Sequence, residues 1–194
     1  MILSLLLAEQ RKRYNVDLVR SEFQRPVKLT KGNWNPSIKI KNKEVLLIAS
    51  GPKAKDYKYE IENYIKLRKP FVIALNTNVC INKKLIDVYT ACNPLKLIAD
   101  SNLYRSLSAP LVVPKSLLSN NLREKFKKLK MLDFGVGIKE NHFKFYKTGA
   151  VMPKLYTIVY ALSIATSGGA SKILLAGFDG YGAKDRRTKI VNEL

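Results

Sequence analysis

The sequence predicts an α/β protein: a mostly parallel, Rossmann-like sheet flanked by helices, with an N-terminal helical arm. Two observations carry this prediction. First, the runs Glu44–Ala49 and Phe71–Leu75 are almost continuously apolar, which is typical of parallel strands covered on both faces. Second, segments with helical spacing of apolar residues alternate with such runs along the chain. Both runs stop at small polar residues, Ser50 and Asn76.

Residues 1–43 are expected to form the arm and a linker, and residues 44–194 the Rossmann-like domain. Leu5–Glu22 is predicted to be helical and to pack either on the domain or on a partner. The apolar stretch Ile2–Ala8 is far shorter than the roughly 20 residues of a membrane span, and no cleavage pattern follows it. Residues 23–43 hold two prolines and a glycine among polar residues, so a linker or irregular segment is predicted there.

The remaining elements are predicted from apolar periodicity and from Pro and Gly breakers. Residues 131–149 show only weak patterning. In chain order we expect a helix over Tyr57–Leu67, a strand over Ile86–Ala91, a helix over Lys96–Leu103, a strand over Ala109–Pro114, a basic amphipathic helix over Ser116–Lys130, a helix opened by Pro153 and ended by Gly168 and Gly169, and a buried strand over Lys172–Phe178.

The formal net charge of +20, mainly from lysine, favours anionic partners. Phosphorylated small molecules, anionic lipid surfaces and nucleic acid all fit this charge. Nucleic acid ranks last because no arginine-rich tract or glycine–aromatic pattern accompanies the lysines. The basic helix over Ser116–Lys130 is either a solvated outer face or a membrane-surface contact. We therefore expect a cytoplasmic protein, with peripheral contact to the inner membrane as the alternative, and reduced thiols at Cys80 and Cys92.

The candidate binding residues follow the predicted strands, where open α/β sheets bind ligands. Asparagine amides suit base edges and ribose hydroxyls, glycine lets backbone N–H groups approach a phosphate, and a tyrosine can donate to a phosphate. Each residue also has a plain interpretation as part of a turn or a cap. The candidates are Ser50, Gly51, Pro52, Asn76, Asn93, Gly177, Asp179 and Tyr181.

Several enzyme classes are excluded by missing motifs. The chain has no P-loop, no Gly-x-Gly-x-x-Gly after a strand and no Gly-x-Ser-x-Gly elbow. His142 is the only histidine, so no histidine-rich metal site is possible, and no metal site is predicted. His142 is either a general base or simply an exposed loop residue.

The motifs resemble the bacterial sialyltransferase family that decorates lipooligosaccharides, and the related domain of flagellin-glycosylation accessory proteins. "EVLLIASGPK" is similar to the family's first strand and Gly-Pro turn. "KTGAVMPKLYTIVYALSIATSGGASKILLAGFDGY" is similar to its Thr-Ser-Gly, helix, strand and Asp-Phe-Tyr block, so the match covers residues 44–182. The resemblance implies that the turn after the first strand contacts the nucleotide of a CMP-sugar. It also implies nucleotide contacts from Asn76, Asn93 and Thr148-Gly149, and a phosphate contact from Tyr181.

The sequence departs from this family in ways that affect chemistry. Ser50 stands where the family usually has asparagine, and Lys53 where serine is common. The family's catalytic histidine and a second phosphate-binding tyrosine lie beyond the Asp-Phe-Tyr block, whereas residues 182–194 contain neither. Three interpretations follow from this difference: the domain is C-terminally incomplete, it binds without catalysing, or another residue or chain completes the site.

Three functions follow from the sequence. The first is a sialyltransferase-like domain for glycan or surface-polysaccharide biosynthesis, which binds a CMP-type nucleotide sugar and an anionic glycan acceptor and needs no other cofactor. Its catalytic candidates are Tyr181 and, more weakly, His142. The second is a non-catalytic nucleotide- or glycan-binding accessory module, for example a fragment of an aldolase-fused protein. The third is a basic nucleic-acid-binding protein. An oligomer is compatible with all three.

Overall fold

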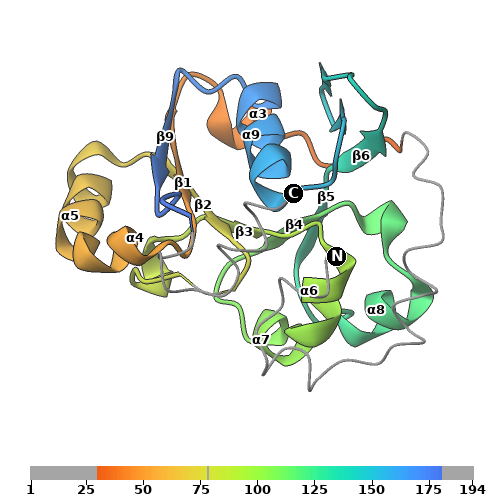
Figure 1. Ribbon diagram of the computed structural model, residues 1–194, viewed down its shortest axis with the longest axis horizontal. Coiled ribbons are helices and arrows are strands. Elements are labelled where there is room, and N and C mark those ends of the chain that lie inside the picture. The colour runs from red at the N-terminus through yellow and green to blue at the C-terminus, as the bar shows by residue number, and fades with distance from the viewer. Residues whose placement is uncertain (1–29, 78, 181–194) are drawn as a thin grey trace.

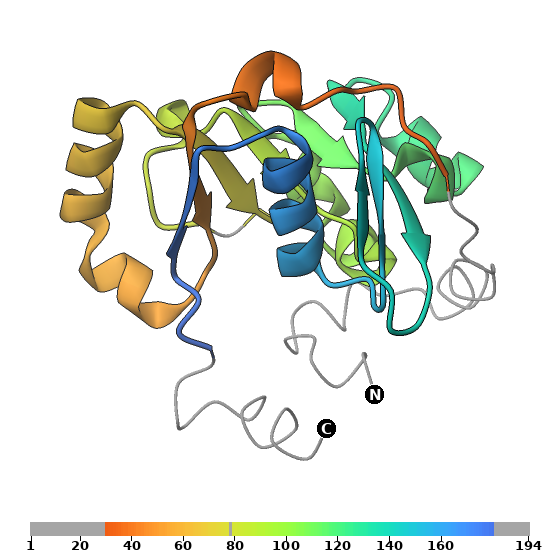
Figure 2. The same ribbon diagram turned by 90° about the horizontal axis from the view of Figure 1, so that it is seen from above.

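The computed structural model describes residues 30–77 and 79–180, which form two sheets with flanking helices (Figures 1 and 2). The large sheet has six strands, all parallel, in the order β5-β4-β3-β2-β1-β9. This confirms the predicted α/β, Rossmann-like class. Its strands are β1 (Glu44–Ile48), β2 (Phe71–Leu75), β3 (Val88–Thr90), β4 (Leu111–Val113), β5 (Met131–Asp133) and β9 (Lys172–Ala176).

A second, three-stranded sheet follows β5 directly and has the order β6-β8-β7. Its strands are β6 (Gly135–Ile138), β7 (Lys144–Tyr146) and β8 (Gly149–Met152). β6 and β7 lie within residues 131–149, where the sequence predicts little structure, and β8 begins at the end of that segment. The strands escape prediction because they are short and contain glycine and lysine, so their stability comes from pairing with one another.

Helices cover the large sheet on both faces. One face packs against α5 (Lys58–Arg68), α6 (Pro94–Ala99), α7 (Ser101–Arg105) and α8 (Asn120–Lys125), and α4 (Pro52–Asp56) follows the end of β1. The other face packs against α9 (Thr157–Ser167), α3 (Ser37–Ile40) and the second sheet. Two 3-10 turns, η2 (Lys83–Leu85) and η3 (Lys115–Leu117), complete the connections. In Figure 2, α9 lies across one face of the sheet, while α5 lies at the end of the molecule where β9 is found.

The predicted central strands are confirmed, and the last strand is not a buried one. Every residue of β2 is buried, as are Val45 to Ile48 of β1. In contrast, β9 ends at Ala176 and forms an edge of the sheet, and its Leu175 is 53% exposed. The apolar run therefore predicts the strand correctly but not its position at the edge.

Two predicted helices are broken into shorter pieces, and a third begins later than predicted. The segment Ser116–Lys130 contains only α8 as an α-helix, because the Ser119 side chain accepts a hydrogen bond from Leu122 N and starts a new helix there. The segment Lys96–Leu103 is divided between α6 and α7. Pro153 lies in the bend after β8, so α9 starts at Thr157 and ends, as predicted, at Gly168.

Residues 30–43, which the sequence assigns to a linker, pack on the domain. Backbone N–H groups of Thr30, Gly32 and Trp34 donate to carbonyl oxygens of the two sheets, and Ile40 of α3 is completely buried. The predicted helix Leu5–Glu22 lies outside the described residues. No helix in the described ranges has the length and apolarity required to cross a membrane.

Tyr160 of α9 joins the helix to the junction between the two sheets. Its hydroxyl donates a hydrogen bond to the carbonyl oxygen of Phe134, and the two rings pack edge to face with centroids 5.8 Å apart. Both side chains are completely buried. Burial raises the pKa of the Tyr160 phenol well above its usual value, so the hydroxyl remains a donor.

We expect Tyr160→Phe to lower the free energy of unfolding by about 1–3 kcal/mol, because the buried Phe134 carbonyl loses its donor. Urea unfolding measures this change. Tyr156→Phe is the matched control, since Tyr156 precedes the same helix but is 54% exposed. Equal effects of the two substitutions would contradict this role of the Tyr160 hydroxyl.

Candidate functional site

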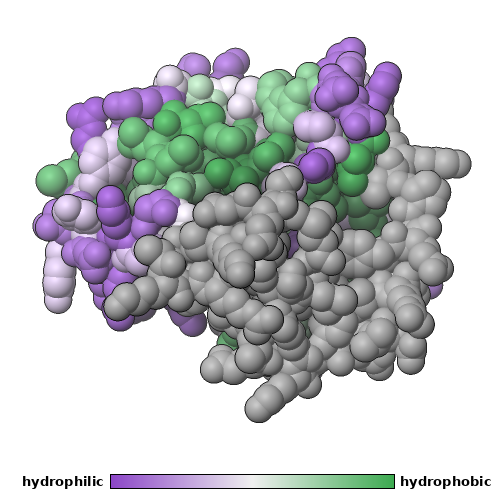
Figure 3. Space-filling view, in the orientation of Figure 1, coloured by the Kyte–Doolittle hydropathy of each residue, from purple (hydrophilic) through white to green (hydrophobic). Residues whose placement is uncertain are grey.

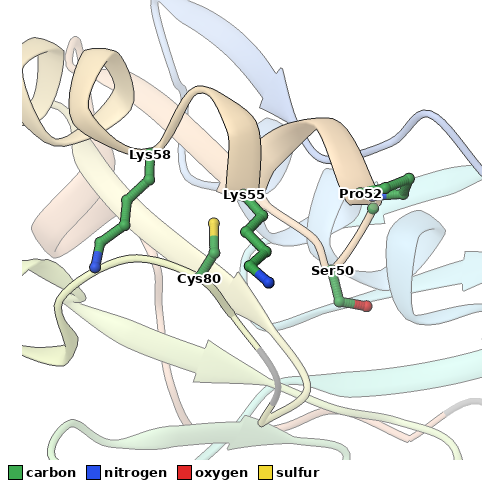
Figure 4. A pocket seen from close by; sticks show the side chains of 6 residues that line it. Ser50, Pro52, Lys55, Lys58 and Cys80 are labelled. Carbon is green, nitrogen blue, oxygen red and sulfur yellow. The ribbon is translucent and has the colours of Figure 1, made fainter.

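A pocket of about 480 Å³ opens where β1 ends (Figure 4). Its lining comes from the turn between β1 and α4, from α4 and α5, and from the segment after β2. The lining side chains offer two ammonium groups, a hydroxyl and a thiol, and they include no carboxylate. The lining residues are Ser50, Gly51, Pro52, Lys55, Lys58 and Cys80.

The turn at this pocket is held by the chain that follows β9. Gly51 N donates to Gly177 O at 2.9 Å, and Lys53 N donates to Asp179 Oδ2 at 2.9 Å. We call this pair of hydrogen bonds the turn–strand contact. It brings Gly51 next to Gly177 and Asp179, which lie 126 and 128 residues further along the chain.

The turn–strand contact explains why glycine occupies two of these positions. A Cβ atom on Gly51 would lie 2.4 Å from Gly177 O and 2.4 Å from Asp179 Oδ1. Gly177 has a φ of +74°, and a Cβ there would lie 2.5 Å from Ala49 O. Glycine at both positions is therefore required by the close approach of two backbone segments, and a ligand is not needed to account for it.

With this geometry, side chains rather than backbone N–H groups would bind an anion in the pocket. The Lys53 N–H is already bonded to Asp179, so an anion would meet chiefly the ammonium groups of Lys55 and Lys58. In Figure 4 both lysines extend from the helical segment toward the side where Ser50 and Cys80 lie. Lys58 Nζ is 3.9 Å from Glu62 Oε1, whereas Lys55 has no acidic partner at salt-bridge distance among the described residues.

Cys80 forms the floor of the pocket beneath α4, and its thiol donates a hydrogen bond to Ala54 O at 3.0 Å. Burial raises the pKa of the Cys80 thiol, which keeps it protonated at neutral pH. Cys92 is fully buried, and burial raises its pKa to about 12. Both cysteines are free thiols.

Asn76 and Asn93 follow β2 and β3, the strands that come after β1 in the sheet order, so both residues lie on the side of the sheet where the strands end. Asn76 has a φ of +59°, its N–H donates to Thr90 O, and its Oδ1 accepts from the hydroxyl of buried Tyr104 at 3.3 Å. Because Oδ1 faces Tyr104, the NH2 group of the Asn76 amide points away from Tyr104. The Asn93 carbonyl accepts from Leu97 N in α6. The sheet order thus places Ser50, Asn76 and Asn93 on the same side of the sheet, at the carboxyl ends of its strands, as predicted.

Thr148 and Gly149 lie far from this pocket. The Thr148 carbonyl accepts from Gly32 N and Gly135 N, both at 2.9 Å. Gly149 pairs with Gly135, and a Cβ on Gly149 would lie 2.8 Å from Gly135 O. Gly135 follows β5, which is four strands away from β1 in the large sheet. Pairing within the second sheet therefore accounts for Gly149.

Of the two catalytic candidates, only His142 lies in the described part of the chain. His142 occupies the turn between β6 and β7, where its N–H donates to Lys139 O, and it does not line the pocket. Tyr181 lies outside the described residues. The sequence analysis missed Lys55, Lys58 and Cys80. The sequence indicates the two lysines only through their three-residue spacing, which would place both side chains on one face of a helix. It gives no indication of Cys80.

The comparisons add no family assignment. No protein-family model matches the chain, and no curated protein matches it in sequence. Within residues 30–77 and 79–180, no group of three or more His, Cys, Asp or Glu side chains could hold a metal ion. The interpretation of the site therefore depends on its geometry and charge.

We expect Gly51→Ala to lower the free energy of unfolding by about 1–3 kcal/mol, the usual cost of inserting a methyl group into a filled space. The added Cβ must displace Gly177 and Asp179, so the turn–strand contact weakens. Thermal or urea unfolding measures the loss. Ser50→Ala at the exposed neighbouring position is the control and should change stability by less than about 0.5 kcal/mol. A Gly51→Ala variant as stable as Ser50→Ala would refute the close packing.

Proposed function

We propose that the protein binds a nucleotide or nucleotide sugar of the CMP type, with its phosphate held by Lys55 and Lys58. One observation carries the proposal: these lysines and Ser50 line one pocket at the carboxyl end of a parallel sheet. Ligands of open α/β sheets bind outside the carboxyl ends of the strands. The cavity of about 480 Å³ falls within the usual range for small-molecule sites, roughly 300–1,000 Å³.

Charge supports a phosphate as the anchoring group. Lysine binds phosphate as a point charge and needs no fixed planar geometry, so two flexible side chains are sufficient. The described residues of the lining hold no carboxylate that would repel the anion, and a net charge of +20 favours its approach. Lys58 forms a weak ion pair with Glu62, which partly neutralises its charge. Lys55 is therefore the stronger contact for the phosphate.

The adjoining strand ends support a nucleoside beside the phosphate. Neighbouring strands lie about 4.8 Å apart, so the ends of β1, β2 and β3 span about 10 Å, which is close to the length of a nucleoside. Asn76, with its N–H donors turned away from Tyr104, suits the acceptor atoms of a pyrimidine or ribose. The resemblance of residues 44–182 to CMP-sugar enzymes favours cytidine as the base.

Binding is a better-supported function than sugar transfer. Transfer requires a base that takes a proton from the acceptor hydroxyl. Among the described residues, the pocket lining contains no histidine or carboxylate, and the raised pKa of Cys80 makes its thiol a poor base. An accessory module that binds a nucleotide or glycan is therefore the first candidate, and a transferase acting on an anionic glycan is the second.

Isothermal titration with CMP should detect binding, and Lys55→Ala should weaken it by at least about tenfold, which corresponds to about 1.4 kcal/mol. Lys58→Ala should have a smaller effect because of the pair with Glu62. Lys66→Ala on α5 is the control of equal charge, since Lys66 is exposed and does not line the pocket. Absence of CMP binding by the folded protein, or an equal loss in all three variants, would refute the proposal.

The two cysteines provide an independent readout in the same samples. Bound CMP should slow alkylation of Cys80 by iodoacetamide, because Cys80 lines the pocket. Cys92 is fully buried and reports only on unfolding. CMP binding without protection of Cys80 would place the ligand elsewhere.

A further inference from the structure

Two phenylalanine side chains are exposed on the second sheet. Phe143 is 46% exposed and Phe145 is 40% exposed, whereas every other phenylalanine in the described part of the chain is buried or partly buried. Their rings pack edge to face, with centroids 4.9 Å apart. We call these two residues the aromatic pair. Phenylalanine normally lies in a protein core, so the aromatic pair is an apolar surface that the fold leaves in contact with water.

The strand register explains why the aromatic pair is exposed. Phe145 pairs with Ala150 of β8, and Phe143, two residues earlier in the chain, lies on the same face as Phe145. Ala150 is completely buried in the core that includes α9, but β7 is an edge of the second sheet. The two rings therefore extend the face that packs on α9 beyond the part that the helix covers.

Lysines surround the aromatic pair. Lys144 lies between the two rings in the chain and points to the opposite face of β7. Lys139 follows β6 and Lys147 follows β7, and all three of these lysines are exposed. Residues 134–160 contain four lysines, the fourth being Lys154, and one acidic residue, Glu140. The apolar rings are thus bordered by positive charge.

The neighbouring surface of α9 carries no charge that would repel an anionic partner. The helix packs against β7 and β8, and none of its 11 residues is Asp, Glu, Lys or Arg. Its Ile158, Val159 and Leu162 are only partly buried. Figure 3 shows apolar side chains over α9 and, beside them, hydrophilic side chains where the second sheet lies in Figure 1.

We propose that the aromatic pair and the lysines around it form a docking surface for an anionic lipid bilayer. The two rings enter the boundary between headgroups and acyl chains, and the ammonium groups of Lys139, Lys144 and Lys147 remain at the lipid phosphates. A bilayer offers an apolar layer directly beneath a negatively charged layer, which complements rings bordered by lysines. The net charge of +20 attracts the protein to such a surface. This inference does not depend on the proposed function.

The structure favours this surface over the membrane contact that the sequence offers as one alternative. The predicted basic helix Ser116–Lys130 contains the α-helix α8, which is only six residues long. The apolar residues of this segment, Leu118, Leu122 and Phe126, are all buried in the core. They cannot enter a bilayer without unfolding the domain, so the lysines of that segment belong to a solvated outer face.

A single-stranded nucleic acid complements less of this surface. Its bases could stack on the aromatic pair and its phosphates could meet the lysines. However, a nucleic acid is charged along its whole length, so it would leave the uncharged side of α9 without an apolar partner. A bilayer covers both the rings and this side of α9.

Co-sedimentation of the full chain with vesicles tests the proposal. We expect binding to vesicles of equimolar phosphatidylglycerol and phosphatidylcholine, and much weaker binding to phosphatidylcholine alone, which has no net charge. The double variant Phe143→Ser/Phe145→Ser should bind the anionic vesicles at least about tenfold more weakly, because it has no rings to transfer out of water.

The matched control is Tyr59→Ser/Leu67→Ser on α5, whose side chains are 77% and 81% exposed and lie at the other end of the molecule from the second sheet (Figure 1). This variant should bind as the unmodified chain does. Circular dichroism confirms that both double variants are folded. Absence of binding to the anionic vesicles, or equal binding by the two double variants, would overturn the proposal.

Fluorescence quenching tests whether the rings enter the bilayer. Lipids with brominated acyl chains should quench the added tryptophan in Phe143→Trp but not the one in Tyr59→Trp. Both variants retain Trp34, the only tryptophan of the chain, which gives the same background in each. Equal quenching in the two variants would show adsorption by charge alone and would overturn the proposal.

A labelled single-stranded oligonucleotide tests the competing partner. We expect Phe143→Ser/Phe145→Ser to leave any binding of the oligonucleotide unchanged, because such binding would come from the overall charge. Fluorescence anisotropy measures it. Oligonucleotide binding that this variant loses, together with no binding to the anionic vesicles, would overturn the proposal and assign the surface to nucleic acid.

Discussion

The turn–strand contact is the constraint on which the site depends. Hydrogen bonds from Gly51 N to Gly177 O and from Lys53 N to Asp179 fix the chain after β1 against the chain after β9. Because α4 begins at this point, the contact also fixes the direction in which the helix presents Lys55 to the pocket. Asp179 is thus a structural acceptor that completes the start of α4, although the sequence offers it as a ligand residue. One of its carboxylate oxygens, Oδ2, already accepts the Lys53 N–H.

The chain after β9 serves the pocket indirectly, because Gly177 and Asp179 hold the turn beside it. The pocket lining itself comes from that turn, from α4 and α5 and from the segment after β2. Lys55 and Lys58 are flexible side chains on packed backbone, so they can move toward a phosphate with little rearrangement of the backbone.

Much of the fold could be predicted from the sequence, whereas long-range pairing could not. Continuous apolarity in β1 and β2 and the small polar residues after them were enough to place Ser50 and Asn76 on one edge. The same apolarity in β9 does not distinguish an edge strand from a central one, because the missing neighbour leaves no local signal. Thr148 and Gly149 resemble a nucleotide-facing turn, but their glycine is required by pairing with Gly135. Two pocket lysines cannot be recognised among 35 lysine and arginine residues without the structure.

The most direct test of the account is the map of amide chemical-shift changes in ¹⁵N-labelled protein titrated with CMP. We predict changes at Ser50, Asn76 and Cys80, which surround the pocket and the adjoining strand end. The amides of Thr148 and His142 should not shift, since both lie in connections between strands of the second sheet. Changes centred on Thr148 or His142, with none near Ser50 and Cys80, would contradict a nucleotide site at the end of β1.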